Sequence, residues 1–189
     1  MDMDCRDAAR LQSFTRFAMP DKKPFKVLIL CTGNSARSII AEYLWRKLGK
    51  GRFETYSAGS TPTGQVNPLA LWVLKDRYDI DASDARSKSW EEYKAAGVQF
   101  DFVITVCDKA QEACPVWPGQ PIVAHWGSPD PAAAEGTEAQ RKYAFVSVAS
   151  QIFQRISLFC AFSDEKLEPI AIKRIGEQFK IEGEAEMKR

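Results

Sequence analysis

The sequence predicts an α/β fold: a doubly wound, four-stranded parallel sheet flanked by helices. Four short apolar runs have the length and composition of strands that are buried on both faces of a sheet. Segments with apolar residues at helical spacing alternate with these runs, and strands that alternate with helices form parallel sheets. Because right-handed crossovers place the carboxyl ends of the strands along one edge, we expect the ligand site at that edge.

The first half of the chain predicts two strand–helix units. Residues 26–31 form a continuous apolar run that ends in a turn of small residues, and a helical pattern follows until Gly49 ends it. The apolar face of this helix consists of Ile39, Ile40, Tyr43, Leu44 and Leu48. Residues 53–58 form the second strand, and Asn67-Pro68 begins the second helix. Its apolar face consists of Leu71, Leu74 and Tyr78.

The second half predicts two more strands and two or three helices. Residues 88–95 have the pattern of a short helix, residues 102–107 form the third strand and residues 121–126 the fourth. Residues 137–140, Thr-Glu-Ala-Gln, match a capping box that begins a long helix. Its buried face consists of Phe145, Ala149, Ile152, Ile156 and Cys160. A further helix near Pro169 is indicated by Leu167, Ala171, Ile175 and Phe179.

These elements predict one domain with two flanking segments. We place an N-terminal extension at residues 1–24, the α/β domain at 25–162, and a C-terminal helical extension and tail at 163–189. Residues 1–24 and 181–189 show no strong periodicity, and we expect their ends to be poorly ordered.

The composition narrows the class of protein. The 26 basic and 25 acidic residues leave a net charge of +1, which favours neither a nucleic acid nor a membrane surface as partner. We see no export signal and no segment near the roughly 18 apolar residues of a membrane-spanning helix, so we predict a cytoplasmic protein. Five cysteines then favour nucleophilic or redox use, because cytosolic thiols are kept reduced. The single histidine, His125, excludes a zinc site with two histidines.

One segment, residues 31–38, carries a clear chemical signal between the first strand and the first helix. Its small residues let the backbone curl, so that N–H groups point inward at the helix N-terminus and form a concave site for a tetrahedral oxyanion. We predict that the oxyanion is bound by Thr32, Gly33, Asn34, Ser35, Ala36, Arg37 and Ser38. Arg37 adds a planar fork of donors, and the same donors predict that Cys31 is a thiolate at neutral pH. The alternative is a buried Cys31 and a surface Arg37 without a function.

This segment resembles the phosphate-binding loop of low-molecular-weight protein tyrosine phosphatases, and more closely that of the thioredoxin-coupled arsenate reductases built on the same fold. The resemblance runs from about residue 25 to 160. Residues 57–59, Ser-Ala-Gly, resemble a family motif on the second strand. Residues 126–131, Trp-Gly-Ser-Pro-Asp-Pro, resemble the loop that delivers a general acid, which implies that Asp130 is the acid. Without the resemblance, Asp130 reads equally well as a turn residue, since Asp-Pro is a common turn dipeptide.

Two further cysteines distinguish the two activities. Cys107 and Cys114 have the spacing and place of a cysteine pair in the arsenate reductases, which ordinary members of the phosphatase family lack. The resemblance implies reduction of arsenate to arsenite through a thiol–arsenate adduct on Cys31, followed by a Cys31–Cys107 and then a Cys107–Cys114 disulfide. Two thiols supply the two electrons that arsenate takes up. We expect regeneration by thioredoxin or a similar dithiol, no bound cofactor, and phosphate or sulfate as competing oxyanions.

The cysteine spacing also predicts a movement. Seven residues of helix advance about 10.5 Å, whereas the Cα atoms of a disulfide lie roughly 4.4 to 6.8 Å apart. If the segment between Cys107 and Cys114 is helical when reduced, it must unwind on oxidation.

The sequence departs from the family patterns in places. Position 36 is Ala, so a disulfide within the loop is excluded, and alanines follow Pro131 where the phosphatases have tyrosines. Some arsenate reductases bind potassium through residues that match Asn34, Glu42 and Ser57. Lys88 can replace that cation here, so we predict no metal. A low-molecular-weight phosphatase and a non-catalytic oxyanion or redox sensor remain as alternatives. We expect Cys5, Cys160 and His125 to have no catalytic role.

Overall fold

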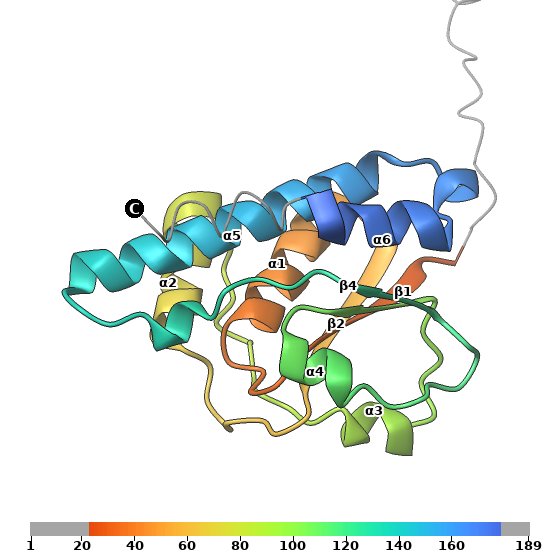
Figure 1. Cartoon of the computed structure of the whole chain (residues 1–189), viewed down its shortest axis with the longest axis horizontal. Helices are drawn as coiled ribbons and strands as arrows, with labels where there is room; N and C mark the ends of the chain where they lie inside the picture. Colours follow the sequence, from red (N-terminus) through yellow and green to blue (C-terminus); the bar gives the residue numbers. More distant parts are fainter. Residues whose placement is uncertain (1–22, 179–189) are drawn as a thin grey trace, which may run out of the picture.

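The computed structural model describes residues 23–178 and contains one parallel sheet of four strands. The strands are β1 (Phe25–Cys31), β2 (Phe53–Gly59), β3 (Phe102–Thr105) and β4 (Ile122–His125). Their order in the sheet is β2-β1-β3-β4, and all neighbouring pairs are parallel. The predicted fold class, a doubly wound four-stranded parallel sheet, is confirmed (Figure 1).

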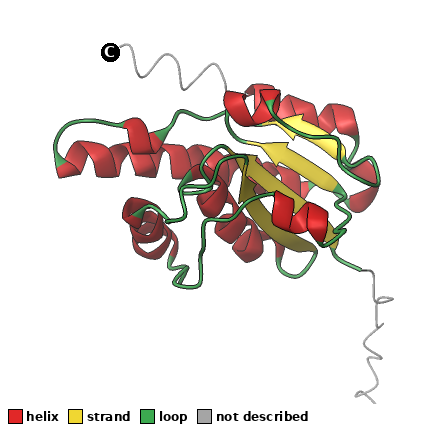
Figure 2. Ribbon diagram, turned by 90° about the horizontal axis from the view of Figure 1, so that it is seen from below, coloured by secondary structure: helices red, strands yellow, loops and turns green. Residues whose placement is uncertain are grey.

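Helices cover both faces of this sheet (Figure 2). The longer ones are α1 (Arg37–Gly49), α2 (Pro68–Tyr78), α5 (Glu138–Ala161) and α6 (Pro169–Gln178). The shorter ones are α3 (Glu91–Ala95), α4 (Asp108–Glu112) and the 3₁₀ turns η2 (Pro131–Ala133) and η3 (Asp164–Lys166). The sheet therefore separates a large apolar layer under α1, α2 and α5 from a smaller one beside α3.

Aromatic side chains fill the larger apolar layer. Trp45 of α1 stacks on Trp126, with ring centroids 5.4 Å apart and planes 4° apart, and Phe159 of α5 packs edge-on against both rings. On the opposite face, Phe100 and Trp117 pack with Leu28, Leu30 and Val103 of the strands. Trp126 directly follows β4, so the larger layer holds the start of the loop that carries Asp130.

The predicted helix starts at Asn67 and Thr137 are confirmed. The Asn67 side chain accepts a hydrogen bond from the N–H of Leu69, and Thr137 forms the full capping box with Gln140. Helix α5 is, by length and composition alone, apolar enough to cross a membrane, which the sequence pattern did not lead us to expect. Core helices pass the same test, and α5 packs its apolar face into the larger layer.

Three predicted elements are shorter in the structure than expected. The third strand ends at Thr105 rather than at residue 107, because the backbone of Cys107 turns to become the N-cap of α4. The fourth strand is shorter at both ends than 121–126. Within 88–95 only α3 is helical, because Ser89 forms a bridge with Gly59 and extends the pairing beside β2.

The helix faces also differ in detail. The fully buried residues of α2 are Ala70, Val73 and Leu74, while the predicted Leu71 and Tyr78 are partly buried.

The C-terminal helix lies where predicted and packs along β4. Leu167, Ile172 and Ile175 are buried, and Trp126 donates its indole N–H to the carbonyl of Ile172 at 3.1 Å. The sequence pattern predicted that Ala171 faces inward, but Ala171 is only partly buried and the neighbouring Ile172 is fully buried. Predictions for residues 1–22 and 179–189, including Cys5, Phe179 and the chain ends, lie outside the described residues. The proposed domain limits stay predictions.

Candidate active site

The segment between β1 and α1 is a curled loop whose carbonyl groups are held from outside. The carbonyls of Cys31, Thr32, Gly33 and Ser35 accept hydrogen bonds from the N–H groups of Ser60, Thr61, Thr63 and Asn67 at 2.9 to 3.2 Å. Because these carbonyls are hydrogen-bonded to the loop that follows the second strand, the backbone N–H groups of the curled segment can point away from that loop. We call residues 31–38 the anion loop.

Two residues allow this curl. Asn34 has a φ of +44°, in the left-handed region that asparagine tolerates better than most residues. Gly59 of β2 lies so close to the loop that a Cβ there would meet the carbonyl oxygen of Thr32 at 2.5 Å. Gly59, the last residue of β2, thus lets the anion loop approach the sheet.

Cys31 is buried at the base of the loop, with 3% of its surface exposed. Its Sγ lies 2.9 Å from Ser38 Oγ, and the N–H of Asn34 donates to it at 3.1 Å. Burial raises the pKa of Cys31 and outweighs these hydrogen bonds, which lower it. The direction is opposite to the predicted thiolate. The motif identified the donors, but it carried no information about how deeply the sulfur is buried.

A chain of buried polar groups supports the loop from behind. The Asn34 side chain donates to Ser38 Oγ and to Ser57 Oγ, both at 2.9 Å. Ser57 donates to Glu42 Oε2 at 2.5 Å, and Lys88 Nζ lies 3.4 Å from the same oxygen. Asn34 and Ser38 are completely buried, so their side chains support the loop and do not face its cavity.

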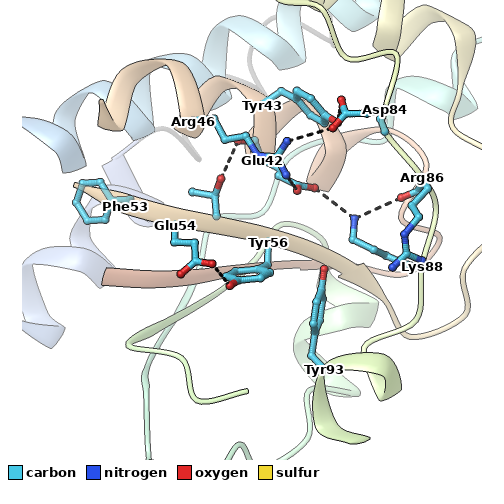
Figure 3. Close-up of a pocket in the computed structure, with 12 residues that line it drawn as sticks. Glu42, Tyr43, Arg46, Phe53, Glu54, Tyr56, Asp84, Arg86, Lys88 and Tyr93 are labelled. Carbon is cyan, nitrogen blue, oxygen red and sulfur yellow. Dashed lines mark hydrogen bonds and ion pairs between the residues drawn. The ribbon is translucent and has the colours of Figure 1, made fainter. Parts of the chain in front are cut away.

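Lys88 occupies the place predicted for a cation. Figure 3 shows its ammonium group directed at the carboxylate of Glu42 from the side opposite α1, beside a cavity of about 470 Å³. Nζ also lies 3.3 Å from Ser57 Oγ and 3.4 Å from the carbonyl of Arg86. Burial lowers the pKa of Lys88, and the Glu42 carboxylate acts in the opposite direction. Within residues 23–178 no group of three His, Cys, Asp or Glu side chains could hold a metal.

In front of the loop lies a second cavity, of about 580 Å³. It is lined by Cys31, Thr32, Gly33, Ser35, Ala36, Arg37, Thr61, Thr63, Cys107, Asp108, Lys109, Asp130 and Ala132. Arg37 Nη2 pairs with Asp130 Oδ2 at 3.1 Å, and Nη1 donates to the carbonyl of Ser128 at 3.0 Å. The structure thus brings together the predicted nucleophile, the arginine and the acid. We call this space the anion cavity.

Cys107 lies in the wall of the anion cavity. Its Sγ is 3.3 Å from Thr32 Oγ1, and the residue is 6% exposed. Two of the three predicted relay sulfurs therefore share one cavity, at the carboxyl ends of neighbouring strands β1 and β3.

Cys114 lies elsewhere. It lines a separate cavity of about 450 Å³ beside β4 and α6, and it packs against the apolar cluster on the α3 side of the sheet. Its backbone follows α4, whose five residues lie between the two cysteines, so the predicted helix is present but short. Burial raises the pKa of Cys114.

Sequence reasoning missed Arg155. This arginine lies on the buried face of α5, 1% exposed, and donates to the carbonyl of Trp126 at 3.1 Å and to Ser128 Oγ at 2.7 Å. Burial lowers its pKa to about 10. A charged residue between Ile152 and Ile156 on an otherwise apolar helix face was the available signal. Arg155 and Arg37 together hold Ser128, two residues before Asp130.

Cys160, which is predicted to have no catalytic role, does not line the anion cavity or the cavity beside Cys114. Cys160 is half-buried on α5, and burial raises its pKa to about 11. It is a free thiol, as are Cys31, Cys107 and Cys114.

Comparison with known proteins identifies the family. Residues 26–159 match the family described as low molecular weight phosphotyrosine protein phosphatase. An arsenate reductase of Oceanobacillus iheyensis is 37% identical over 133 residues, which cover 70% of this chain and 93% of that protein. A solved arsenate reductase of Archaeoglobus fulgidus is 25% identical with a TM-score of 0.57, covering 72% of this chain and 99% of that one.

A solved thioredoxin-dependent arsenate reductase of Corynebacterium glutamicum is 27% identical with a TM-score of 0.52, covering 73% of this chain and 64% of that one. The family match at residues 26–159 includes the anion loop and all four strands except the first residue of β1, and it ends before α6. The chain belongs to the low molecular weight phosphotyrosine protein phosphatase family and, within it, groups with the arsenate reductases.

Proposed function

We propose that this protein reduces arsenate to arsenite, with Cys31 as the nucleophile and Cys107 and Cys114 as a thiol relay. The observation that carries the proposal is the second sulfur in the anion cavity, Cys107, whose Sγ lies 3.3 Å from Thr32 Oγ1. A phosphatase needs the nucleophile, the arginine and the acid, and has no use for this thiol. Reduction of arsenate requires two electrons, which two thiols release on forming a disulfide.

The first step forms the adduct. The anion loop and Arg37 bind arsenate, and Cys31 attacks arsenic while Asp130 gives a proton to the departing oxygen, which leaves as water. An oxyanion that takes up the Arg37 donors competes with the Arg37–Asp130 ion pair. Because burial raises the pKa of Cys31, its thiol must lose a proton before it attacks, and the bound oxyanion is a base that can accept it.

The second step transfers the electrons. The Cys107 thiolate attacks the Cys31 sulfur, the sulfur–arsenic bond breaks, and its electron pair stays on arsenic, which departs as arsenite. Cys114 then attacks Cys107, which frees Cys31 and leaves a Cys107–Cys114 disulfide. Since Cys114 lines a different cavity, this last exchange requires residues 107–118 to rearrange.

We infer that an external dithiol, thioredoxin or a similar protein, reduces the Cys107–Cys114 disulfide. Support comes from the thioredoxin-dependent arsenate reductase of Corynebacterium glutamicum among the similar structures. Phosphate and sulfate are expected to compete for the anion loop, because they share the shape and charge of arsenate. The cytoplasm is the predicted compartment, since its thiol reductants can maintain the relay. We propose that the enzyme needs neither a bound cofactor nor a metal.

The substitution Cys107→Ser tests the proposal. It should abolish arsenate-dependent oxidation of thioredoxin and preserve slow hydrolysis of an aryl phosphate, because Cys31, Arg37 and Asp130 stay in place. Cys160→Ser, which removes a half-buried thiol outside the cavity, is the matched control and should retain both activities. Loss or retention of both activities in Cys107→Ser would contradict the relay. A phosphatase, the second candidate, would retain full aryl phosphate hydrolysis and show no arsenate turnover, and a sensor would turn over neither substrate.

A further inference from the structure

Behind Cys107, a chain of side-chain contacts joins the sheet to the start of α4. Thr105 and His125 are in register at the ends of β3 and β4, and Thr105 Oγ1 lies 2.8 Å from His125 Nδ1. The other ring nitrogen, Nε2, lies 3.0 Å from Oδ1 of Asp108, the first residue of α4. The histidine side chain is 11% exposed and that of Asp108 is 85% exposed. His125 therefore links the rigid sheet to the residue that follows Cys107.

The next loop leaves room for this contact. A Cβ on Gly127 would lie 2.6 Å from His125 Nε2 and 3.4 Å from Asp108 Oδ1. Any larger residue at position 127 would displace the imidazole or the carboxylate. The chain that leads toward Asp130 thus passes directly beside the His125–Asp108 contact.

Helix α4 is otherwise weakly attached. It has five residues, of which Ala110 is the only buried one. A helix of this length is not stable in isolation, so its tertiary contacts decide whether it forms. In the part of the chain that the structure describes, the contact with His125 is the polar side-chain link between α4 and the sheet.

We propose that His125 is a positioning residue for the thiol relay: through Asp108 it holds the first turn of α4 in the reduced arrangement and makes the Cys107–Cys114 disulfide easier to reduce. The inference rests on the proposed relay, in which Cys114 must leave its own cavity to reach Cys107. Asp108, next to Cys107, is carried along by that rearrangement and loses its contact with His125. A contact made only in the reduced form stabilises that form relative to the disulfide.

The equilibrium involved is a simple exchange. The protein disulfide and a reduced small dithiol give two protein thiols and the oxidised, cyclic dithiol, with two electrons and two protons transferred. Arsenate takes no part, so the positioning role can be measured separately from turnover.

The experiment is a redox titration of the whole chain carrying Cys31→Ser, against mixtures of reduced and oxidised dithiothreitol. Alkylation and peptide mass mapping give the fraction of Cys107–Cys114 disulfide. Asp108→Ala and His125→Ala should each shift the equilibrium constant about three- to tenfold toward the disulfide, as expected for one hydrogen bond to a charged group at the surface. A tenfold shift corresponds to about 30 mV. The double variant should shift no further than either single one.

Glu112→Ala is the matched control, because it removes another exposed carboxylate from α4 and should leave the equilibrium unchanged. Asp108 is exposed, so Asp108→Ala keeps the test valid should His125→Ala impair folding. Asp108→Asn, which retains a hydrogen-bonding group, should shift the equilibrium less than Asp108→Ala.

The titration distinguishes failure of the proposed relay from failure of the proposed role of His125. Absence of the Cys107–Cys114 disulfide at every dithiothreitol ratio would overturn the relay itself. A disulfide that forms normally, with Asp108→Ala behaving like Glu112→Ala or with the two single effects adding in the double variant, would overturn only the role of His125.

Discussion

Replacing Lys88 by methionine tests the polar chain behind the anion loop. Methionine keeps much of the volume of the side chain but removes the ammonium group, whose Nζ lies 3.4 Å from Glu42 Oε2 and 3.3 Å from Ser57 Oγ. The side chains of Lys88 and Glu42 are only 9% and 4% exposed. The substitution therefore leaves a buried carboxylate with one cationic partner fewer (Figure 3).

The expected loss of stability follows from these contacts. Removing one partner of a buried ion pair costs about 3 to 5 kcal/mol, because the other charge stays buried without compensation. Glu42 keeps its contacts with Arg46 and Ser57, so we expect a smaller cost, about 2 to 3 kcal/mol. In a protein of this size each kcal/mol lowers the melting temperature by roughly 2 to 4 °C, which gives a decrease of roughly 4 to 12 °C.

Urea unfolding followed by circular dichroism measures this cost. Lys94→Met removes a more exposed ammonium that pairs with Glu91 at the surface, and it should cost less than about 1 kcal/mol. The double variant Glu42→Gln/Lys88→Met removes both charges and should be more stable than Lys88→Met alone. A Lys88→Met protein within about 0.5 kcal/mol of the unaltered chain would refute the reasoning, since surface substitutions have effects of that size.

The same variant tests whether Lys88 takes the place of a potassium ion. The unaltered chain should have equal stability in potassium and sodium chloride at the same ionic strength. Lys88→Met should be stabilised by potassium more than by sodium, because the oxygens of Glu42, Ser57 and Arg86 that face Nζ become free to bind a cation. Equal effects of the two salts on the variant would mean that these oxygens form no selective site.

Three further predictions concern the anion cavity. Because burial raises the pKa of Cys31, its alkylation without added oxyanion should have a pH midpoint above that of an ordinary thiol, and a midpoint below neutrality would contradict this. The contribution of the protonated Cys31 to the free energy of unfolding should be present below the pKa of the unfolded state and should be lost as pH rises through the pKa of the folded state. Gly59→Ala should weaken phosphate binding at least about tenfold in calorimetry, because the new Cβ displaces the Thr32 carbonyl; unchanged affinity would contradict the close approach. Arg155→Met should lower kcat for arsenate and leave Cys31 alkylation unchanged, because Ser128 and the carbonyl of Trp126 lose a donor while the contacts of Cys31 stay in place; an unchanged kcat would exclude a role in positioning that loop.

Patterns along the chain were sufficient for the fold because its elements are short and strongly periodic. The apolar run that ends at Cys31 and the capping box at Thr137 each depend on neighbouring residues only, and both were predicted correctly. The end of the third strand was not, because the residues up to Cys107 are all compatible with a strand. The strand stops because the backbone of Cys107 turns into α4, and no pattern within the apolar run marks that turn.

Site residues that lie within a sequence motif were predictable, whereas their burial and their distant partners were not. Cys31, Arg37 and Asp130 were named from a loop motif and a resemblance, and they line one cavity. Burial could not be inferred from the motif. The sequence therefore predicted a lowered pKa for Cys31, whereas burial raises it in the structure. Arg155 was missed because its role depends on a carbonyl and a hydroxyl that are distant in sequence.

The error at the end of β3 bears on the chemistry. In a strand, the direction of the Cys107 side chain would be fixed by the alternation of the sheet. As the N-cap of a five-residue helix, Cys107 follows Val106, whose N–H donates to the carbonyl of Leu30 in β1, and it precedes a segment that can unwind without disturbing the strands. The proposed relay needs this freedom, because the Cys107 sulfur must meet Cys31 in one step and Cys114 in the next. A cysteine two residues earlier, at the end of β3, would remain paired with β1 and could serve only the first exchange.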